Sequence, residues 1–361
     1  MKANRKFAAL AVTGIVLPAL LFYSVSLPRS PGDRGLKLMH KDLPQFSVPN
    51  HTVIHVDQIP PTTPSPHTAL AEHVQRMCHK LDMTPVPSKV RPDMFHHILV
   101  DDRYKFLYCY IPKVACTNWR RVMLVLSGKV KVKDLMDIQA TDVHARYRRF
   151  LPTLSDMSME QIRYRLDNYY KFMFVREPFE RLLSAYRNKL QSKHKSSQYF
   201  RDTFGRSIIK RFRESQEGDN KGGKPVNAKN ANKQTVHFHE FLQYLVDPVR
   251  TEPLNEHWAK YYKLCHPCFM NYDFIGKYDT LEADASHVLK AVHADHVVQF
   301  PPRSAAYKYN RTSTRLSDYY KDIPPSLLRR VYKSYHADFV LFNYTVPEDM
   351  TELLRSDGGK D

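Results

Sequence analysis

The segment KFLYCYIPKVACTNWRRVMLVLSG, residues 105–128, constrains the fold of this chain more than any other. An apolar strand, Phe106–Ile111, leads into a short loop, Pro112–Asn118. An amphipathic helix, Trp119–Leu126, follows and ends at Gly128. Such a loop aims unpaired backbone N–H groups at one point, and the positive end of the helix dipole adds to them. The segment therefore predicts a strand–loop–helix unit that suits an anion.

The side chains of this loop also favour a phosphate. Lys113 is a mobile positive charge, and Thr117 and Asn118 add donors beside the helix start. The Gly-rich pattern G-x-x-x-x-G-K-[ST] of nucleotide triphosphatases occurs nowhere in the chain. For this segment considered alone, an ordinary α/β turn is the alternative.

A second segment, residues 170–190, repeats the architecture. Its strand, Phe172–Val175, is followed by a turn at Arg176–Glu177, and Pro178 then occupies the favoured first position of a helix. Apolar side chains recur every three or four residues, at Phe179, Leu182, Leu183, Tyr186 and Leu190. This spacing predicts a helix with one buried face. Arg176, at the end of the strand, is placed to bind a phosphate through two N–H groups, and Ser184 lies off the apolar face.

In combination and order, PKVACTNW (112–119) and FVREPFERLLSAY (174–186) resemble the two cofactor signatures of the Golgi carbohydrate sulfotransferases. The branch that contains the chondroitin and dermatan 4-O-sulfotransferases is the most similar. Further likeness, in NEHW (255–258) and LCHPC (264–268) among others, extends it over residues 94–347. The resemblance implies a P-loop-like α/β sulfotransferase fold, with a mostly parallel central sheet flanked by helices, in a single lumenal domain.

The resemblance also implies a cofactor site. In that family the first signature binds the 5′-phosphosulfate of 3′-phosphoadenosine 5′-phosphosulfate (PAPS), and the second binds its 3′-phosphate. The implied cofactor-binding residues here are Pro112, Lys113, Val114, Ala115, Cys116, Thr117, Asn118, Arg176, Glu177, Pro178, Phe179, Glu180, Arg181, Leu182, Leu183 and Ser184. Lys113 would neutralise the leaving 5′-phosphate, while Arg176 and Ser184 would hold the 3′-phosphate. No metal is required.

His144 is the predicted catalytic base, acting with Lys113. Sulfuryl transfer needs a group that takes the proton from the attacking sugar hydroxyl. Related sulfotransferases place a Glu or His at a similar distance beyond the loop lysine, and His144 lies 31 residues beyond Lys113. An imidazole pKa near ~6.5 suits this task. The chain has 18 histidines, and His237, His239 and His257 are the alternatives.

The net charge of +18 implies a polyanionic partner: nucleic acid, an anionic membrane or an acidic glycan. Residues 187–233 hold 13 Lys and Arg against 4 Asp and Glu. We interpret residues 187–213 as a trough for an anionic glycosaminoglycan, with solvated surface as the alternative, and residues 214–232 as a disordered insertion. Because a lumenal domain does not meet nucleic acid, that partner is excluded.

The N-terminal residues indicate the lumenal location of the domain. Three basic residues in the cytoplasmic tail, 1–6, precede 21 uncharged residues, 7–27, which are long enough to span a ~30 Å hydrocarbon core. We interpret them as a signal-anchor of a type II Golgi membrane protein; a cleaved signal peptide is the alternative. The Pro-rich residues 28–67 form a stem, and residues 68–361 form the lumenal domain.

The chain has five cysteines, at positions 78, 109, 116, 265 and 268. Half a zinc site and a redox C-x-x-C are alternatives for Cys265 and Cys268, but an oxidising lumen favours a structural disulfide. An odd count leaves at least one free thiol, which we predict to be Cys116; the pairing stays open. Sequons at Asn50, Asn310 and Asn343 predict N-glycans.

The predicted activity is transfer of sulfate from PAPS to a GalNAc 4-hydroxyl of chondroitin. A dermatan or N-glycan GalNAc 4-O-sulfotransferase is the alternative within the class. A lumenal kinase would need Mg²⁺-binding carboxylates near the loop, where only Asp134 and Asp137 qualify. A non-catalytic glycosaminoglycan-binding protein would explain the basic segment but not two phosphate units.

Overall fold

The computed structural model describes residues 68–84, 90–214, 235–302 and 312–355. All of them belong to one compact unit, residues 61–361. None of the helices in these ranges is both long and apolar enough to cross a membrane. The predicted cytoplasmic tail, anchor and stem, and the sequons at Asn50 and Asn310, lie outside the described residues.

A four-stranded sheet organises the described residues. Its strands are β1 (Ile98–Asp101), β2 (Phe106–Cys109), β3 (Tyr170–Val175) and β4 (Phe274–Lys277), in the spatial order β1-β2-β3-β4. β1 is antiparallel to β2, because the short turn between them reverses the chain. β2, β3 and β4 are parallel and are joined by long helical crossovers. The predicted mostly parallel sheet flanked by helices is thus confirmed.

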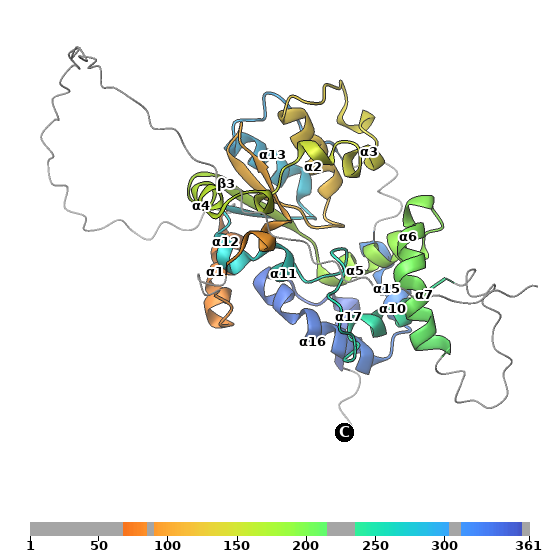
Figure 1. The fold of residues 1–361 in the computed structure, drawn as a ribbon. Coiled ribbons are helices and arrows are strands. Elements are labelled where there is room, and N and C mark those ends of the chain that lie inside the picture. Colours follow the sequence, from red (N-terminus) through yellow and green to blue (C-terminus); the bar gives the residue numbers. More distant parts are fainter. Residues whose placement is uncertain (1–67, 85–89, 215–234, 303–311, 356–361) are drawn as a thin grey trace, which may run out of the picture. The chain divides into compact units, whose positions relative to one another are not determined.

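The helices lie around this sheet and beyond its edge (Figure 1). They are α1 (Ala69–Lys80), α2 (Cys116–Leu126), α3 (Ala140–His144), α4 (Met159–Asn168), α5 (Pro178–Tyr186), α6 (Gln198–Phe200), α7 (Arg206–Ile209), α10 (Phe238–Leu245), α11 (Tyr261–Cys265), α12 (Pro267–Met270), α13 (Leu281–Ala291), α15 (Leu316–Tyr320), α16 (Pro325–Leu341) and α17 (Glu348–Arg355). Three π-helical segments adjoin α5, α6 and α7: Arg187–Gln191, Arg201–Gly205 and Lys210–Glu214.

One hydrophobic core surrounds the sheet. Trp119 of α2 packs on Phe172 of β3 with ring centroids 4.7 Å apart, and Tyr108 of β2 stacks on the same ring at 5.0 Å. In β4, Gly276 lies opposite Phe174, and a Cβ atom there would come within 2.4 Å of that ring. These aromatic contacts fix α2, and hence the loop before it, against the parallel strands.

A second core lies among α5, α10, α15 and α16, which Figure 1 shows gathered beyond the end of β3. Phe179 of α5 contacts Tyr320 and Phe339 at centroid distances of 5.3 and 5.2 Å. Trp258 is 0% exposed within this core. It therefore packs as a core residue and offers no surface on which a sugar could stack.

The start of α2 differs from the sequence prediction. The helix begins at Cys116, not Trp119, so Thr117 and Asn118 lie in its first turn. Its N-cap, Ala115, has a left-handed φ of 56° and no capping side chain. The usual N-cap signal is thus missing from the sequence, because Ser, Thr, Asp or Asn normally supplies it.

Two disulfides fasten the helices to the sheet. Cys78 of α1 pairs with Cys268 of α12, and Cys109 of β2 pairs with Cys265 of α11. Cys116 is a free, buried thiol, as predicted. Cys265 and Cys268 therefore form structural disulfides, but with distant partners and not with each other.

This pairing predicts the outcome of thiol labelling. When the full-length protein is denatured without reductant and treated with iodoacetamide, mass spectrometry should find the label on Cys116 alone. Prior reduction should label all five cysteines and serves as the control. A peptide linking Cys265 to Cys268, or label on Cys78, would contradict the pairing.

Candidate active site

The loop between β2 and α2 has an unusual backbone. Lys113 and Ala115 have left-handed φ angles of 74° and 56°, which cost non-glycine residues about 1–3 kcal/mol each. Left-handed residues in a turn direct successive N–H groups into one concavity, a geometry that binds anions. Strain of this kind is expected where the loop has a function.

Three of the N–H groups in this concavity are available to a ligand. Val114 donates to the Ile111 carbonyl at 3.3 Å, and Asn118 donates to the Ala115 carbonyl at 3.0 Å. No acceptor for the N–H groups of Ala115, Cys116 and Thr117 occurs among the residues that the structure describes. Because these groups begin an eleven-residue helix, they combine free donors with the positive end of its dipole. We refer to Lys113–Thr117 as the anion loop.

Two lysines add charge to the anion loop. Lys113 is half-buried, and its Nζ donates to Asn188 Oδ1 at 3.1 Å. Burial, and then repulsion from Lys189, lowers the pKa of Lys113 to about 7. Burial also lowers the pKa of Lys189, which lies in the π-helical segment Arg187–Gln191. The sequence prediction placed Asn188 and Lys189 in the glycan trough and not at this loop, because it did not foresee the π-helical turn that holds them.

Arg181 of α5 connects the residue directly before the anion loop, Pro112, to residues 256–259. Its side chain is 1% exposed and donates from Nε to the Pro112 carbonyl at 3.2 Å. Nη1 and Nη2 donate to the carbonyls of Ala259 and Glu256 at 2.6 and 2.8 Å. The predicted phosphate ligand Arg181 is thus engaged with three carbonyls, and it positions residues 256–259 beside the loop.

The amino end of α5 is capped by the side chain of Glu177, the residue directly before the helix. Glu177 accepts hydrogen bonds from the N–H groups of Phe179 and Glu180 at 3.0 and 2.6 Å. Burial raises the pKa of this carboxyl to about 8. The two units are therefore not equivalent: α2 leaves its first N–H groups free, whereas those of α5 are satisfied by Glu177.

Arg176 is the predicted 3′-phosphate ligand that lies nearest the loop. It donates from Nη1 to the Lys113 carbonyl at 3.4 Å and forms an ion pair with Glu180 at 3.1 Å. A phosphate bound through the Nε of Arg176 would have to displace Glu180. The Ser184 side chain is half-buried and has no hydrogen-bond partner in the described part of the chain. The other predicted residues of this signature are buried: Pro178, Phe179, Leu182 and Leu183.

His144, at the end of α3, does reach the anion loop. Its Nε2 lies 3.0 Å from Thr117 Oγ1, and its Nδ1 lies 3.1 Å from Arg120 Nη1. A guanidinium only donates, so Nδ1 accepts and the proton of the neutral ring is on Nε2. Desolvation of the ring, followed by the charge of Arg120, lowers the pKa of His144 to about 4. Its role as base stays a prediction, although both ring nitrogens are engaged.

Two of the alternative histidines lie at the start of α10. His237, His239 and Glu240 bring possible metal-ligand atoms within 4.8 Å of one another. Both carboxylate oxygens of Glu240, however, accept hydrogen bonds from Arg213 at 2.6 Å. A cation there would compete with a guanidinium, so the donor set does not fit a metal.

The fold and the loop define an α/β protein with a concave group of N–H donors, suited to an anion, at the carboxyl end of a parallel strand. The sulfotransferase family model matches residues 96–345, so the chain belongs to that family. It is 42% identical to carbohydrate sulfotransferase 11 of Rattus norvegicus over 261 residues, which cover 71% of this chain and 69% of that protein. It is 44% identical to carbohydrate sulfotransferase 14 of Homo sapiens over 274 residues, covering 76% and 67%. No solved structure matches the chain.

The three bonds of Arg181 predict a large loss of stability on its removal. Arg181→Met would keep much of the side-chain volume but leave three carbonyls without their donor, and should lower the free energy of unfolding by about 3 kcal/mol or more. Urea unfolding of the full-length protein measures this change. Arg163→Met, at an exposed position of α4, is the matched control and should change it by less than about 0.5 kcal/mol. Equal effects of the two substitutions would contradict the proposed role of Arg181.

Proposed function

We propose that this protein transfers a sulfuryl group from PAPS to a hydroxyl of an anionic glycan, with O-4 of GalNAc in chondroitin as the favoured acceptor. GalNAc in dermatan or on N-glycans is the alternative. The observation that carries the proposal is the anion loop, with three N–H groups free of acceptors among the described residues and Lys113 beside them. Family membership and the carbohydrate sulfotransferases that the chain resembles support the reaction class.

In this proposal the protein works by placing positive charge where the donor's leaving group becomes negative. The loop N–H groups and Lys113 bind the 5′-phosphate, and they stabilise it further as the sulfur–oxygen bond breaks. Arg176 and Ser184 bind the 3′-phosphate after Glu180 gives way. The donor supplies the activated sulfuryl group, and no metal is needed for that chemistry.

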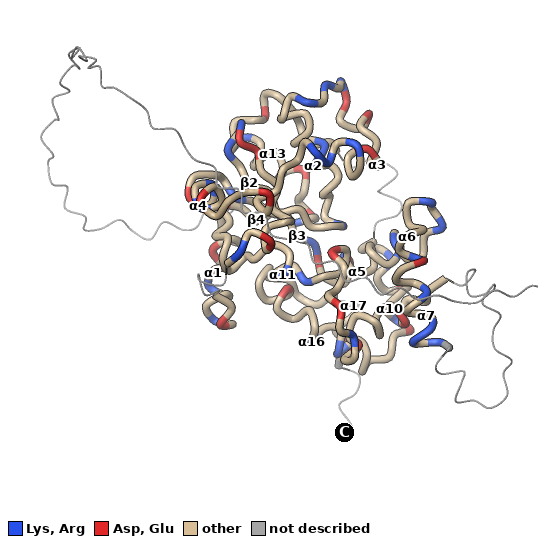
Figure 2. The backbone as a smooth tube through the Cα atoms, in the orientation of Figure 1, with Lys and Arg blue, Asp and Glu red and all other residues tan. Residues whose placement is uncertain are grey.

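Basic residues support an anionic acceptor. Figure 2 shows Lys and Arg around α6 and α7, and again near α2 and α3. Several cations of the predicted trough are already paired, as in the ion pairs of Arg206 with Asp202 and Arg213 with Glu240. Lys193 and Lys195 are exposed and remain candidates for binding the glycan.

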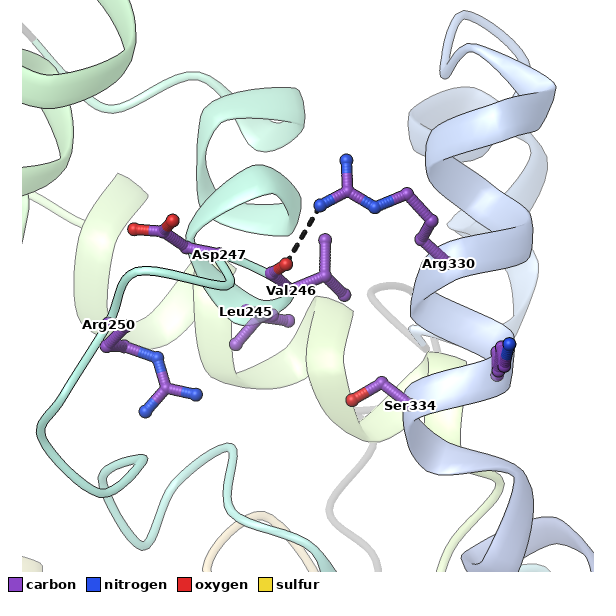
Figure 3. Close-up of a pocket in the computed structure, with 7 residues that line it drawn as sticks. Leu245, Val246, Asp247, Arg250, Arg330 and Ser334 are labelled. Carbon is purple, nitrogen blue, oxygen red and sulfur yellow. Dashed lines mark hydrogen bonds between the residues drawn. The ribbon is translucent and has the colours of Figure 1, made fainter.

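A second basic surface lies between α10 and α16. A cavity of about 360 Å³ is lined by Arg250, Arg330 and Lys333, among other residues. Figure 3 shows Arg330 reaching from α16 to the Val246 carbonyl, to which it donates at 2.9 Å. Because Asp247 is the one acidic residue beside these three basic ones among the described residues that line the cavity, the cavity favours a polyanionic over a neutral glycan.

The proposed location is the lumenal side of the Golgi membrane, with residues 7–27 as the anchor. The two disulfides support an oxidising compartment. Asn343 is exposed just after α16, as a glycan acceptor must be, and we also propose glycans at Asn310 and Asn50.

The alternative that this protein is a lumenal kinase has less support. A kinase would need Mg²⁺ ligands such as Asp134 near the loop, but a side-chain oxygen of Asp134 accepts the Met136 N–H at 2.8 Å and caps a short 3₁₀ helix.

A transfer assay tests the proposal directly. The full-length protein is given ³⁵S-labelled PAPS with desulfated chondroitin, dermatan and heparosan, and the products are digested to disaccharides. We expect label on O-4 of GalNAc, and Lys113→Ala should abolish it. Label on another position would support the reaction class but would show that the acceptor hydroxyl is a different one. Tight binding of 3′,5′-ADP without transfer to any glycan would contradict the proposed activity.

The lowered pKa of Lys113 predicts a pH dependence of binding. The free protein carries the charged lysine below about pH 7. A bound phosphate favours the charged form, so above this pH binding takes up a proton, and the Kd for 3′,5′-ADP should rise by up to about tenfold per pH unit between pH 7.5 and 9.5. Calorimetry measures both the Kd and the proton uptake. Lys113→Arg, which stays charged, should flatten the profile; an unchanged slope in this variant would contradict the assignment.

A further inference from the structure

His257 has a ring nitrogen that is free to accept a proton. Its Nδ1 lies 2.8 Å from Asn255 Oδ1, and its backbone N–H donates to the same oxygen at 3.1 Å. An amide oxygen accepts, so Nδ1 carries the proton and the lone pair of the neutral ring is on Nε2. Nε2 has no hydrogen-bond partner within the described ranges. His144 has the opposite arrangement, since a donor already occupies its lone pair.

The imidazole of His257 also lies beside the anion loop. Its ring packs edge-on against Phe200 with centroids 4.9 Å apart, and Lys189 Nζ lies 4.3 Å from the centroid of the same Phe200 ring. The neighbouring residue, Glu256, is bound through its carbonyl to Arg181, which also holds the Pro112 carbonyl. The two lysines of the site, Lys113 and Lys189, are near enough to influence the titration of His257.

We propose that His257 is the base that deprotonates the acceptor hydroxyl, with Asn255 as the positioning residue that fixes its tautomer. This inference rests on the proposed function. The hydroxyl proton moves to Nε2 as the hydroxyl oxygen forms a bond to the sulfur. The bond from sulfur to the 5′-phosphate oxygen breaks, and that phosphate leaves with the electron pair beside Lys113. The imidazolium then returns its proton to water.

The charges around His257 link this base to donor binding. The charged and titratable neighbours are Lys189, Lys113, Arg181, His144 and Glu256, whose Oε1 lies 3.8 Å from Nδ1. Burial, followed by the charges of Lys189 and Lys113, holds the pKa of His257 well below its usual range. The phosphates of the donor would neutralise both lysines and so raise this pKa toward neutrality. The base thus becomes effective once the donor is bound.

Substitution of His257 tests the inference. His257→Gln should lower kcat by about 10²- to 10⁴-fold and leave the Kd for 3′,5′-ADP within about twofold. His144→Gln should lower kcat less. His79→Gln, at an exposed position of α1, is the matched control and should be as active as the wild type. Wild-type-like kcat in His257→Gln, or a larger loss in His144→Gln, would overturn the inference and leave the proposed function standing.

A second variant gives a readout that a merely structural role would not change. Asn255→Asp keeps the acceptor oxygen but adds a negative charge beside Nδ1, so the acidic limb of the kcat–pH profile should move to higher pH. An unmoved limb in an active variant would overturn the role of His257, even if His257→Gln failed to fold. A wild-type protein that transfers sulfate to no glycan would overturn the proposed function, and this inference with it.

Discussion

The arrangement of the site depends on the buried guanidinium of Arg181. One planar group donates to the carbonyl of Pro112, directly before the anion loop, and to carbonyls of residues 256–259, more than a hundred residues away in the sequence. Loss of any one bond would leave a buried carbonyl without a partner, so the two segments are held together at a fixed separation. The loop proposed to bind the leaving group and the histidine proposed as base are thereby positioned by a single side chain.

Electrostatic repulsion is the second constraint on the site. Lys113, Lys189, Arg176 and Arg181 gather with few carboxylates. Burial lowers the pKa of both lysines, and repulsion from Lys189 lowers that of Lys113 further. Such a site is unfavourable when empty and becomes favourable when a polyanion binds. The stability lost by grouping these cations would be recovered as binding energy when the proposed donor binds.

The sequence predicted the sheet, both strand–loop–helix units and the free thiol of Cys116, because local patterns determine them. It did not predict the start of α2, since Ala115 caps that helix by its backbone alone. It also assigned Asn188 and Lys189 to the glycan trough, whereas they lie in a π-helical segment beside Lys113. The sequence prediction treated the second unit as equivalent to the first, because it overlooked that Glu177 caps α5 with its own side chain. The predicted phosphate ligands on α5 therefore include residues that pack or position instead.

The two disulfides have a consequence for how the protein reaches its native state. Cys265 and Cys268 are close in the sequence, yet their partners are 156 and 190 residues away. During oxidation, the nearby pair can form first as a non-native bond, since closing a short loop is entropically easier than closing a long one. Native pairing then requires thiol exchange after β2 and α1 have docked. Production of this protein therefore depends on a compartment that isomerises disulfides as well as forming them.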